Sequence, residues 1–272
     1  MADRDSLAII IVTYNSVQEI DACLHSLVGQ TSPFPTTISV VDNASPDGTA
    51  AHVRKSWPSV QVIDSGGNFG FAKANNLGIR ATTSDYVLLM NPDTVAQPGA
   101  IETLVRGLAS NPDAAIAGPR LLSETGFPEL SWGAPINPWN ELRTMIFSWL
   151  YLRKLRVLVR RMDKLSRSAR EVAWVSGACM VVRRPDLEAV GLLDERYFMY
   201  NEDVDLCLAM QKRGRRVLYV AGAEVLHHRG RSAARNPEME RLRQQSHVAY
   251  YEKHLPAWIP LLRIYLKVMG KA

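Results

Sequence analysis

This sequence of 272 residues has few cysteines, no long apolar run and no secretion signal. Its three cysteines, Cys23, Cys179 and Cys207, cannot form a disulfide framework in a chain of this length, and we interpret the last two as small core residues. The start of the chain lacks the charged, apolar and small-residue pattern typical of a secretory signal. The longest apolar stretch is interrupted by Arg263 and Lys267 and is too short to cross a bilayer. We expect a protein of the reducing cytoplasm that does not span the membrane.

Two common phosphate-binding patterns are also absent. No Gly-x-Gly-x-x-Gly follows the first apolar run, and no Gly-Lys-Ser or Gly-Lys-Thr occurs, so the sequence supports neither a dinucleotide enzyme nor a phosphate-loop ATPase. Disorder and collagen-like repetition are excluded as well, because 47% of the residues are apolar and 22% are charged.

Charge is unevenly divided along the chain. Residues 1–135 contain 7 basic and 13 acidic side chains, whereas the remainder contains 25 basic and 14 acidic ones. The mild net charge of +5 therefore combines a negative first half with a strongly positive second half. This asymmetry predicts an anionic partner, a membrane or a nucleic acid, for the second half alone.

Short apolar runs alternate with helical patterns through the first half. Residues 7–13 form a β-branched apolar run that is too short for a helix and typical of a strand buried on both faces. Further strands are predicted at 38–41, 60–63, 86–90 and 114–117, and helices at 48–56, 70–80 and 98–110. The alternation predicts an α/β fold with a mostly parallel central sheet flanked by helices, whose ligand site lies at the carboxyl ends of the strands.

Four of these strands end in short polar segments, at 13–15, 42–48, 66–76 and 91–93. Each segment taken alone is also an ordinary turn, since Asp, Asn and Gly are common turn residues. Their shared position at one edge of the sheet favours a ligand site, because turn formation does not require amides and carboxylates to converge there.

The polar segments resemble the motifs of the family 2 glycosyltransferases, enzymes of the GT-A fold that transfer a sugar from a nucleotide diphosphate donor. The similarity extends over residues 6–235. Its motifs are Val-Thr-Tyr-Asn at 12–15, Val-Asp-Asn-Ala-Ser at 41–45, Asn-Phe-Gly-Phe-Ala-Lys-Ala-Asn-Asn at 68–76, Asn-Pro-Asp at 91–93, Asn-Glu-Asp-Val-Asp-Leu at 201–206 and His-His-Arg-Gly-Arg-Ser at 227–232. Within the family, the motifs at 68–76 and 91–93 are most similar to bacterial rhamnosyltransferases of cell-wall or surface polysaccharide synthesis.

The resemblance implies a Rossmann-like catalytic domain over residues 1–235 and an amphipathic helical tail over 236–272. The domain is expected to consist of a nucleotide-sugar-binding half (1–135), a basic amphipathic helical insertion (136–170) and an acceptor half that carries the catalytic residue (171–235).

A donor site at the strand ends is implied in the same way. The expected nucleotide-sugar-binding residues are Thr13, Tyr14, Asn15, Asp42, Asn43, Asn68, Gly70, Phe71, Asn75, Asn91 and Asp93. The first four are assigned to the base and ribose, and Asn68 and Asn75 border the nucleotide and sugar. Gly70 allows a close approach of the backbone.

A divalent cation, manganese or magnesium, is implied to offset the charge of the diphosphate leaving group. Asp93 matches the metal-binding carboxylate, but Asn91 stands where the family's usual Asp-x-Asp motif has a second acidic residue. His227, in the pattern His-x-x-Gly-x-Ser, matches the family histidine that completes the metal shell. The alternative is that His227 and His228 are simply the polar end of a strand.

The reaction implied by the resemblance is a single inverting displacement, in which an acceptor hydroxyl attacks the anomeric carbon of the donor. Asp203 matches the general base that takes the hydroxyl proton, and Glu202 is the substitute candidate. The aromatic run at 197–200 is interpreted as a wall that faces the sugar. The alternative is that Asn201 caps a helix whose dipole the following acidic residues favour.

Three further residues are expected at the donor-sugar and acceptor pocket, namely Trp174, Gly177 and Ala178. An indole can pack on the face of a sugar ring, but Trp174 would serve equally well as a core residue.

Two basic amphipathic regions are predicted in the second half, at 142–170 and in the tail after residue 249. The first is expected to present one helical stripe, consisting of Met145, Trp149, Leu152, Leu155, Val159 and Met162. Apolar and aromatic residues beside cations are typical of helices that lie on an anionic bilayer, whereas nucleic acid gains nothing from the apolar residues. The alternative is that both regions pack on the catalytic domain or form a homo-oligomer.

We therefore predict a metal-dependent inverting glycosyltransferase that is peripheral on the inner face of the cell membrane and binds no nucleic acid. Its donor is expected to be dTDP-L-rhamnose, and its acceptor a saccharide linked by diphosphate to a polyprenol. UDP-N-acetylglucosamine, UDP-galactose or a furanose donor is the alternative within the same fold. A noncatalytic membrane-bound scaffold is the alternative from another class.

Overall fold

The computed structural model describes residues 5–30, 33–153, 156–228 and 237–268. In these residues a nine-stranded sheet has the order β3-β2-β1-β4-β10-β6-β11-β5, and β8 pairs with β11. Its strands are β1 (Leu7–Thr13), β2 (Thr36–Asp42), β3 (Gln61–Asp64), β4 (Tyr86–Met90), β5 (Thr94–Ala96), β6 (Ala114–Leu122), β8 (Arg170–Glu171), β10 (Cys179–Arg183) and β11 (Arg216–His227). A two-stranded sheet pairs β7 (Trp132–Gly133) with β9 (Trp174–Val175).

Ten α-helices occur in the described residues. They are α1 (Ile20–His25), α2 (Thr49–Ser56), α3 (Gly70–Arg80), α4 (Ala100–Ala109), α5 (Pro138–Leu152), α6 (Arg156–Ser166), α7 (Arg184–Ala189), α8 (Glu202–Lys212), α9 (Pro237–His254) and α10 (Ile259–Val268), and the short 3₁₀ helix η2 (Pro256–Trp258) joins the last two. The strands β3, β2, β1 and β4 are parallel, and β10 runs antiparallel between β4 and β6. The predicted α/β fold with a mostly parallel sheet is therefore confirmed.

Strand β1 lies between two hydrophobic cores. Ile9 and Ile11 point to the face that α1, α2 and α4 cover, whereas Ile10 and Val12 point to the face that α3, α7 and α8 cover. All seven residues of β1 are buried, because helices cover both faces of the sheet. Parallel pairing brings the carboxyl ends of β1, β2 and β4 to one edge, and the predicted site residues follow these ends.

The basic insertion is not one continuous helical stripe, as the sequence predicted, but two helices, α5 and α6. Met162 of α6 is buried, whereas Trp149 of α5 is 53% exposed. Arg120 of β6 holds α6 to the sheet, because its guanidinium pairs with Asp163 at 2.7 Å and with Glu224 at 2.5 Å. These long-range contacts of Arg120 cannot be recognised from local periodicity. The side chains of Leu152, Leu155 and Val159 lie outside the described part of the structure.

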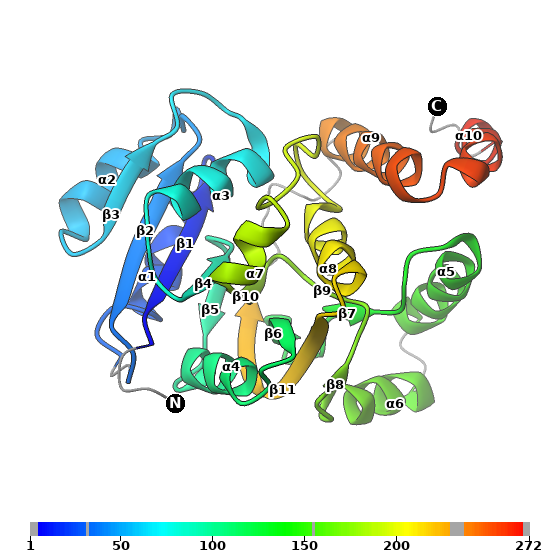
Figure 1. The fold of residues 1–272 in the computed structure, drawn as a ribbon, viewed down its shortest axis with the longest axis horizontal. Coiled ribbons are helices and arrows are strands. Elements are labelled where there is room, and N and C mark those ends of the chain that lie inside the picture. The colour runs from blue at the N-terminus through cyan, green and yellow to red at the C-terminus, as the bar shows by residue number, and fades with distance from the viewer. Residues whose placement is uncertain (1–4, 31–32, 154–155, 229–236, 269–272) are drawn as a thin grey trace.

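The C-terminal helices pack on α8 and form a third core. Tyr250, Tyr251 and Leu262 are buried there against Val204 and Tyr197. Figure 1 shows α5, α6, α9 and α10 at the end of the molecule opposite to β3 and α2. The predicted tail therefore packs in part on the catalytic domain, which was the alternative to membrane binding. Within the described ranges, no helix combines the length and the apolar content needed to span a bilayer.

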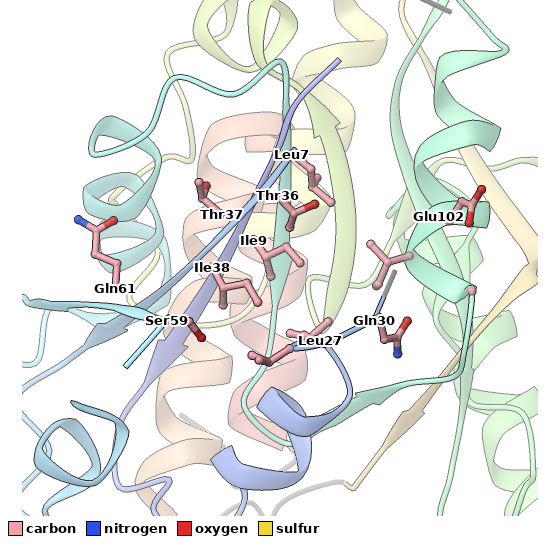
Figure 2. Close-up of a pocket in the computed structure, with 14 residues that line it drawn as sticks. Leu7, Ile9, Leu27, Gln30, Thr36, Thr37, Ile38, Ser59, Gln61 and Glu102 are labelled. Atoms are coloured by element: carbon pink, nitrogen blue, oxygen red, sulfur yellow. The ribbon is translucent and has the colours of Figure 1, made fainter. Parts of the chain in front are cut away.

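A cavity of about 470 Å³ opens beside the amino-terminal halves of β1 and β2, as Figure 2 shows. It is lined by Leu7, Ile9, Thr36, Ile38 and Glu102, among others. This cavity lies at the opposite end of the strands from the polar segments, so it is separate from the predicted site.

Candidate functional site

Asp42 joins the ends of β1 and β2. Its Oδ1 accepts hydrogen bonds from Thr13 Oγ1 at 3.0 Å and from Ser45 Oγ at 2.6 Å, and its Oδ2 accepts one from the Ser45 backbone N–H at 2.9 Å. Thr13 and Asp42 are both buried, at 0% and 3% exposure. Their hydrogen bonds therefore fix the shape of the loops after β1 and β2, where a base and ribose are expected to bind.

The residues beside this pair form the accessible rim. Tyr14 is 48% exposed, and Asn15 is exposed in a left-handed backbone conformation with φ of 55°. The Asn15 backbone N–H donates to Ser45 Oγ at 3.0 Å, which links the two loops. Ala44 also has a positive φ of 60°. Non-glycine residues in this conformation are uncommon and concentrate at functional sites, which supports a binding role for the rim.

The start of α3 is held close to the second half of the chain. Gly70 has a φ of +79°, and a Cβ there would lie 2.1 Å from the Phe198 carbonyl oxygen, so only glycine fits. The Phe71 backbone N–H donates to the same carbonyl at 2.6 Å, and Asn43 Nδ2 donates to the Gly70 carbonyl at 3.0 Å. The close backbone approach expected at Gly70 is therefore a contact between the start of α3 and the segment that contains Phe198.

The asparagines before and within α3 differ in exposure. Asn68 is exposed, and its Oδ1 accepts a hydrogen bond from the Gly70 N–H at 3.2 Å. Asn75 is fully buried and donates to the Phe71 carbonyl at 2.9 Å, so this geometry does not support its predicted contact with the nucleotide and sugar. Asn76 is also buried, and it binds the backbone of Leu193 in both directions. Asn76 therefore holds α3 to the segment that contains Leu193.

The Asn-Pro-Asp segment forms the turn from β4 to β5. The Asn91 carbonyl accepts hydrogen bonds from the backbone N–H of Thr94 at 3.3 Å and from its Oγ1 at 2.6 Å. The Asn91 backbone N–H donates to the Ala178 carbonyl at 2.9 Å. Asp93 follows this turn with 18% of its side chain exposed. The turn thus places a carboxylate at the sheet edge, beside the segment that contains Ala178.

Asp93 lies beside His227, at the end of β11, as the metal prediction required. Their Oδ1 and Nε2 atoms are 3.5 Å apart, and His227 Nδ1 is 3.0 Å from Glu129 Oε2. Burial alone would lower the pKa of His227, but the hydrogen bonds and charges of Asp93 and Glu129 outweigh it and raise this pKa to about 9. Two carboxylates around one imidazole therefore make this position strongly favourable for positive charge.

The donor set at this position fits a divalent cation. A histidine that binds a metal commonly donates its other ring N–H to a carboxylate, which is the relation of His227 Nδ1 to Glu129. In the described part of the chain, no group of three His, Cys, Asp or Glu side chains is arranged as a complete metal site. Two protein ligands suffice where substrate phosphate oxygens complete the shell, as is common for magnesium. The sequence did not identify Glu129, because a single glutamate in a loop carries no recognisable pattern.

Asp203 lies at the start of α8, against the glycine before Ala178. Its Oδ2 accepts the Gly177 backbone N–H at 2.8 Å, and its Oδ1 accepts the Val204 N–H at 2.8 Å. Burial raises the pKa of Asp203, and the two N–H groups oppose the rise only in part. Segment 177–178 therefore connects the predicted base to Asn91, which begins the turn carrying Asp93.

Glu202 is in a different environment from Asp203. It is 5% exposed, its Oε2 has no hydrogen-bond partner among the described residues, and burial together with the charge of Asp203 raises its pKa well above the usual value. The raised pKa of Glu202 favours its protonated form, which weakens its case as the substitute base. Tyr200 and Asn201 precede it with φ values of 73° and 66°. Asn201 occupies the N-cap position of α8 with acidic residues in the first turn, as the capping alternative held, but its side chain makes no cap hydrogen bond.

Two aromatic expectations need correction. Tyr197 is fully buried and donates its hydroxyl to Asp205 at 3.2 Å, so it is not part of a wall facing the sugar. Trp174 donates its Nε1–H to the Ala134 carbonyl at 2.9 Å, and its ring packs against Gly133 and two hydrophobic cores. Trp174 is therefore partly a core residue, as its alternative interpretation held.

Asp205 anchors the C-terminal helices, a role that the sequence did not reveal. Its carboxylate accepts hydrogen bonds from His254 Nε2 at 2.6 Å and from Lys253 Nζ at 2.8 Å, both on α9. Lys253 also pairs with Asp194 at 2.8 Å. This partly buried cluster joins the end of α9 to the first turn of α8, which also carries Asp203.

Comparison with known proteins gives the same picture as the geometry. The profile described as "Glycosyl transferase family 2" matches residues 8–190. N-acetylglucosaminyl-diphospho-decaprenol L-rhamnosyltransferase of Mycobacterium tuberculosis is 32% identical over 92% of this chain and 82% of its own length. Rhamnosyltransferase WbbL of Escherichia coli K12 is 28% identical over 60% of this chain and 62% of its own.

Among solved structures, mannosyltransferase PcManGT from Pyrobaculum calidifontis, in complex with GDP-Man and Mn²⁺, is similar in fold. Its TM-score is 0.65 with 18% identity, over 96% of this chain and 68% of that one. The likeness shows the GT-A fold.

Proposed function

The chain belongs to glycosyl transferase family 2 and is a glycosyltransferase of the GT-A fold, and we propose that it transfers L-rhamnose from dTDP-L-rhamnose to a lipid-linked saccharide. The 32% identical relative is named for transfer of L-rhamnose to a diphosphate-linked decaprenol saccharide, which supports both substrates. The observation that carries the proposal is the placement of Asp203, through segment 177–178, beside the turn that holds Asp93.

The proposed reaction is one inverting displacement. The acceptor hydroxyl oxygen attacks the anomeric carbon, a new glycosidic bond forms, and the bond from that carbon to the β-phosphate oxygen breaks. Asp203 takes the hydroxyl proton, and the Gly177 and Val204 N–H groups hold its carboxylate in one orientation. Asn43 and Gly70 keep the start of α3 close to Phe198, which closes the site between the two halves of the domain.

Asp93 and His227 would hold a manganese or magnesium ion, with Glu129 orienting the imidazole. When bound, the cation supplies positive charge that stabilises the departing diphosphate.

We further propose that the enzyme is peripheral on an anionic membrane, where it meets its acceptor. Exposed apolar side chains of α5, η2 and α10 form what we call the apolar face, which consists of Trp139, Leu142, Met145, Ile146, Trp149, Trp258, Leu261, Ile264 and Tyr265. Helices α5 and α10 lie side by side, since Tyr265 Oη of α10 is 4.0 Å from Met145 Sδ of α5. Exposed cations lie beside these side chains, namely Arg143 of α5, Arg153 directly after α5, and Arg263 and Lys267 of α10. Apolar area together with positive charge matches an anionic bilayer.

The test of the transfer reaction is a donor comparison on the purified chain. Radiolabelled dTDP-L-rhamnose, UDP-N-acetylglucosamine and UDP-galactose are each incubated with an N-acetylglucosaminyl-diphospho-isoprenoid, with and without manganese. We expect incorporation from dTDP-L-rhamnose alone, its loss with a chelator, and an inverted anomeric configuration by NMR. Incorporation only from a UDP-sugar would show that this sugar nucleotide, and not dTDP-L-rhamnose, is the donor. Nucleotide binding without transfer from any donor would favour the noncatalytic scaffold.

A further inference from the structure

Residues 198–201, which we call the linking segment, connect the start of α3 to the start of α8. The Phe198 carbonyl accepts the Phe71 backbone N–H at 2.6 Å, so one end of the linking segment lies against α3. Its other end leads directly into α8, whose second residue is Asp203. Because the main chain is continuous, a displacement of the linking segment moves the predicted base.

Two adjoining residues of the linking segment have an unfavourable backbone conformation. Tyr200 has a φ of 73° and Asn201 a φ of 66°, in the left-handed region that few residues other than glycine occupy. The Asn201 side chain makes no cap hydrogen bond at the start of α8. Such a conformation persists only where the surrounding structure imposes it, and it concentrates at functional sites. The contacts that α9 makes with this segment are therefore of interest.

Helix α9 contacts two adjoining residues of the linking segment. The Ser246 hydroxyl donates to the Met199 carbonyl at 2.6 Å, and Ser246 is 5% exposed. The central carbon of the Arg243 guanidinium lies 4.8 Å from the centroid of the Tyr200 ring, which is a cation–π arrangement. Arg243 also pairs with Glu240 of the same helix at 3.2 Å. Since Arg243 and Ser246 are at i and i+3 of α9, one face of the helix makes both contacts.

The same helix also holds a residue that follows the base. Asp205 accepts hydrogen bonds from His254 Nε2 at 2.6 Å and from Lys253 Nζ at 2.8 Å, both at the C-terminal end of α9. Helix α9 therefore contacts the chain on both sides of Asp203. The 2.8 Å hydrogen bond from the Gly177 N–H to Asp203 depends on where these contacts place the start of α8.

We propose that α9 positions the base, with Ser246 and Arg243 as positioning residues that hold the linking segment and, through it, the Asp203 carboxylate. The inference rests on the proposed function, because it assumes that Asp203 takes the proton of the acceptor hydroxyl. Loss of either contact lets Tyr200 and Asn201 relax toward a more favourable backbone conformation, which turns the start of α8. The base is then displaced, whereas the loops after β1 and β2, where the nucleotide is expected to bind, keep their shape.

Steady-state transfer kinetics of Ser246 variants test this role. Ser246→Ala removes the hydroxyl and should lower kcat by about tenfold to a hundredfold, because a misplacement of about 1 Å can cost a hundredfold in rate. The KM for the donor and the affinity for dTDP should stay as in the parent. Ser246→Thr keeps a hydroxyl and should retain most of the rate. Gln245→Ala, at the neighbouring exposed position of α9, is the matched control and should have no effect.

Arg243 tests the second contact and is exposed, so it keeps the test decisive if Ser246→Ala fails to fold. Arg243→Gln should lower kcat by about threefold to tenfold, whereas Arg243→Lys keeps a cation over the ring and should retain most of the rate. Arg241→Gln removes a charge at another exposed position of α9 and should act as the parent does. Tyr200→Leu removes the ring, so the double variant with Arg243→Gln should be no slower than the slower single variant.

Hydrogen exchange followed by mass spectrometry on the same preparations separates this inference from the proposed function. We expect faster exchange over residues 198–204 in Ser246→Ala and in Arg243→Gln. Parental kcat in both variants, an equal loss of kcat in Gln245→Ala, or a loss of dTDP affinity that matches the loss of kcat would overturn the positioning role. Faster exchange in the variants, together with a parent that transfers no sugar from any donor, would support the hold of α9 on the linking segment and reject the proposed reaction.

Discussion

The backbone N–H of Gly177 donates a hydrogen bond of 2.8 Å to Oδ2 of Asp203, and a Cβ on Gly177 would lie 3.2 Å from the Asp203 Cβ. The glycine thus allows the segment before β10 to approach the start of α8 closely. Since the next residue, Ala178, accepts from Asn91, this approach connects the base to the end of β4.

Asp203→Asn should lower kcat by about a hundredfold to ten-thousandfold, because the general base is removed. Gly177→Ala should lower kcat by about tenfold to a hundredfold, because the added methyl displaces the carboxylate. Both variants should bind dTDP as the parent does, which equilibrium titration measures alongside the rate. Transfer at the parental rate by Asp203→Asn would remove Asp203 from the mechanism.

The pH dependence of kcat should reflect the environment of Asp203. Burial raises the pKa of Asp203, so the protonated, inactive form persists to a higher pH than for an ordinary aspartate. As pH falls, activity should therefore be lost at a pH above about 4, the usual value for an aspartate side chain. Rates measured from pH 4 to 9, with circular dichroism at each pH as the control for folding, test this. An acid limb at or below pH 4 contradicts it.

Glu129→Gln should lower manganese affinity by about tenfold to a hundredfold, because the carboxylate that orients His227 is replaced. Electron paramagnetic resonance of free manganese gives the affinity without reference to activity. The matched control is Glu124→Gln, whose parent side chain lies 3.0 Å from the neighbouring His228. Equal affinities of the two variants would show that Glu129 has no part in metal binding.

Asp205→Asn should lower the free energy of unfolding by about 3 kcal/mol, because it removes the carboxylate that pairs with buried His254 and leaves Lys253 with Asp194 alone. Glu252→Gln is the control on the same helix, since its pair with Arg263 is exposed and contributes about 0.5 kcal/mol or less. Urea unfolding followed by circular dichroism measures both. If the two variants unfold alike, the cluster does not anchor α9.

Replacing Trp149 and Ile264 by Glu should abolish sedimentation with anionic vesicles at low salt, because both side chains are more than half exposed on the apolar face. Binding of the parent should decrease at high salt, since its cations are screened. Ala51→Glu adds a single negative charge on α2, at the opposite end of the molecule, and should bind as the parent does (Figure 1). A dimer that the double variant dissociates, without vesicle binding by the parent, would assign the face to self-association.

Local patterns were sufficient for most elements of the first half, although they did not predict β5 or β7. The runs at 7–13 and 86–90 coincide with β1 and β4, and the pattern at 70–80 coincides with α3, because apolar periodicity depends on near neighbours in the chain. The same reasoning failed for Met162, which the stripe placed at a surface and Arg120 helps to bury with α6. A helical period shows which residues share a face, but not what that face contacts.

The sequence by itself determined the α/β fold and the polar segments at the strand ends, because these depend on the order and chemistry of nearby residues. The candidate residues Asp93, Asp203 and His227 were identified through the resemblance of their motifs to those of the family. Only the tertiary structure decided that Glu129 lies beside His227, 98 positions away, and that Asp205 is paired with His254, 49 positions away. It also decided which apolar side chains of α5 and α10 stay exposed. The physical reason is that contacts between distant residues depend on how whole elements pack, and no local pattern records that packing.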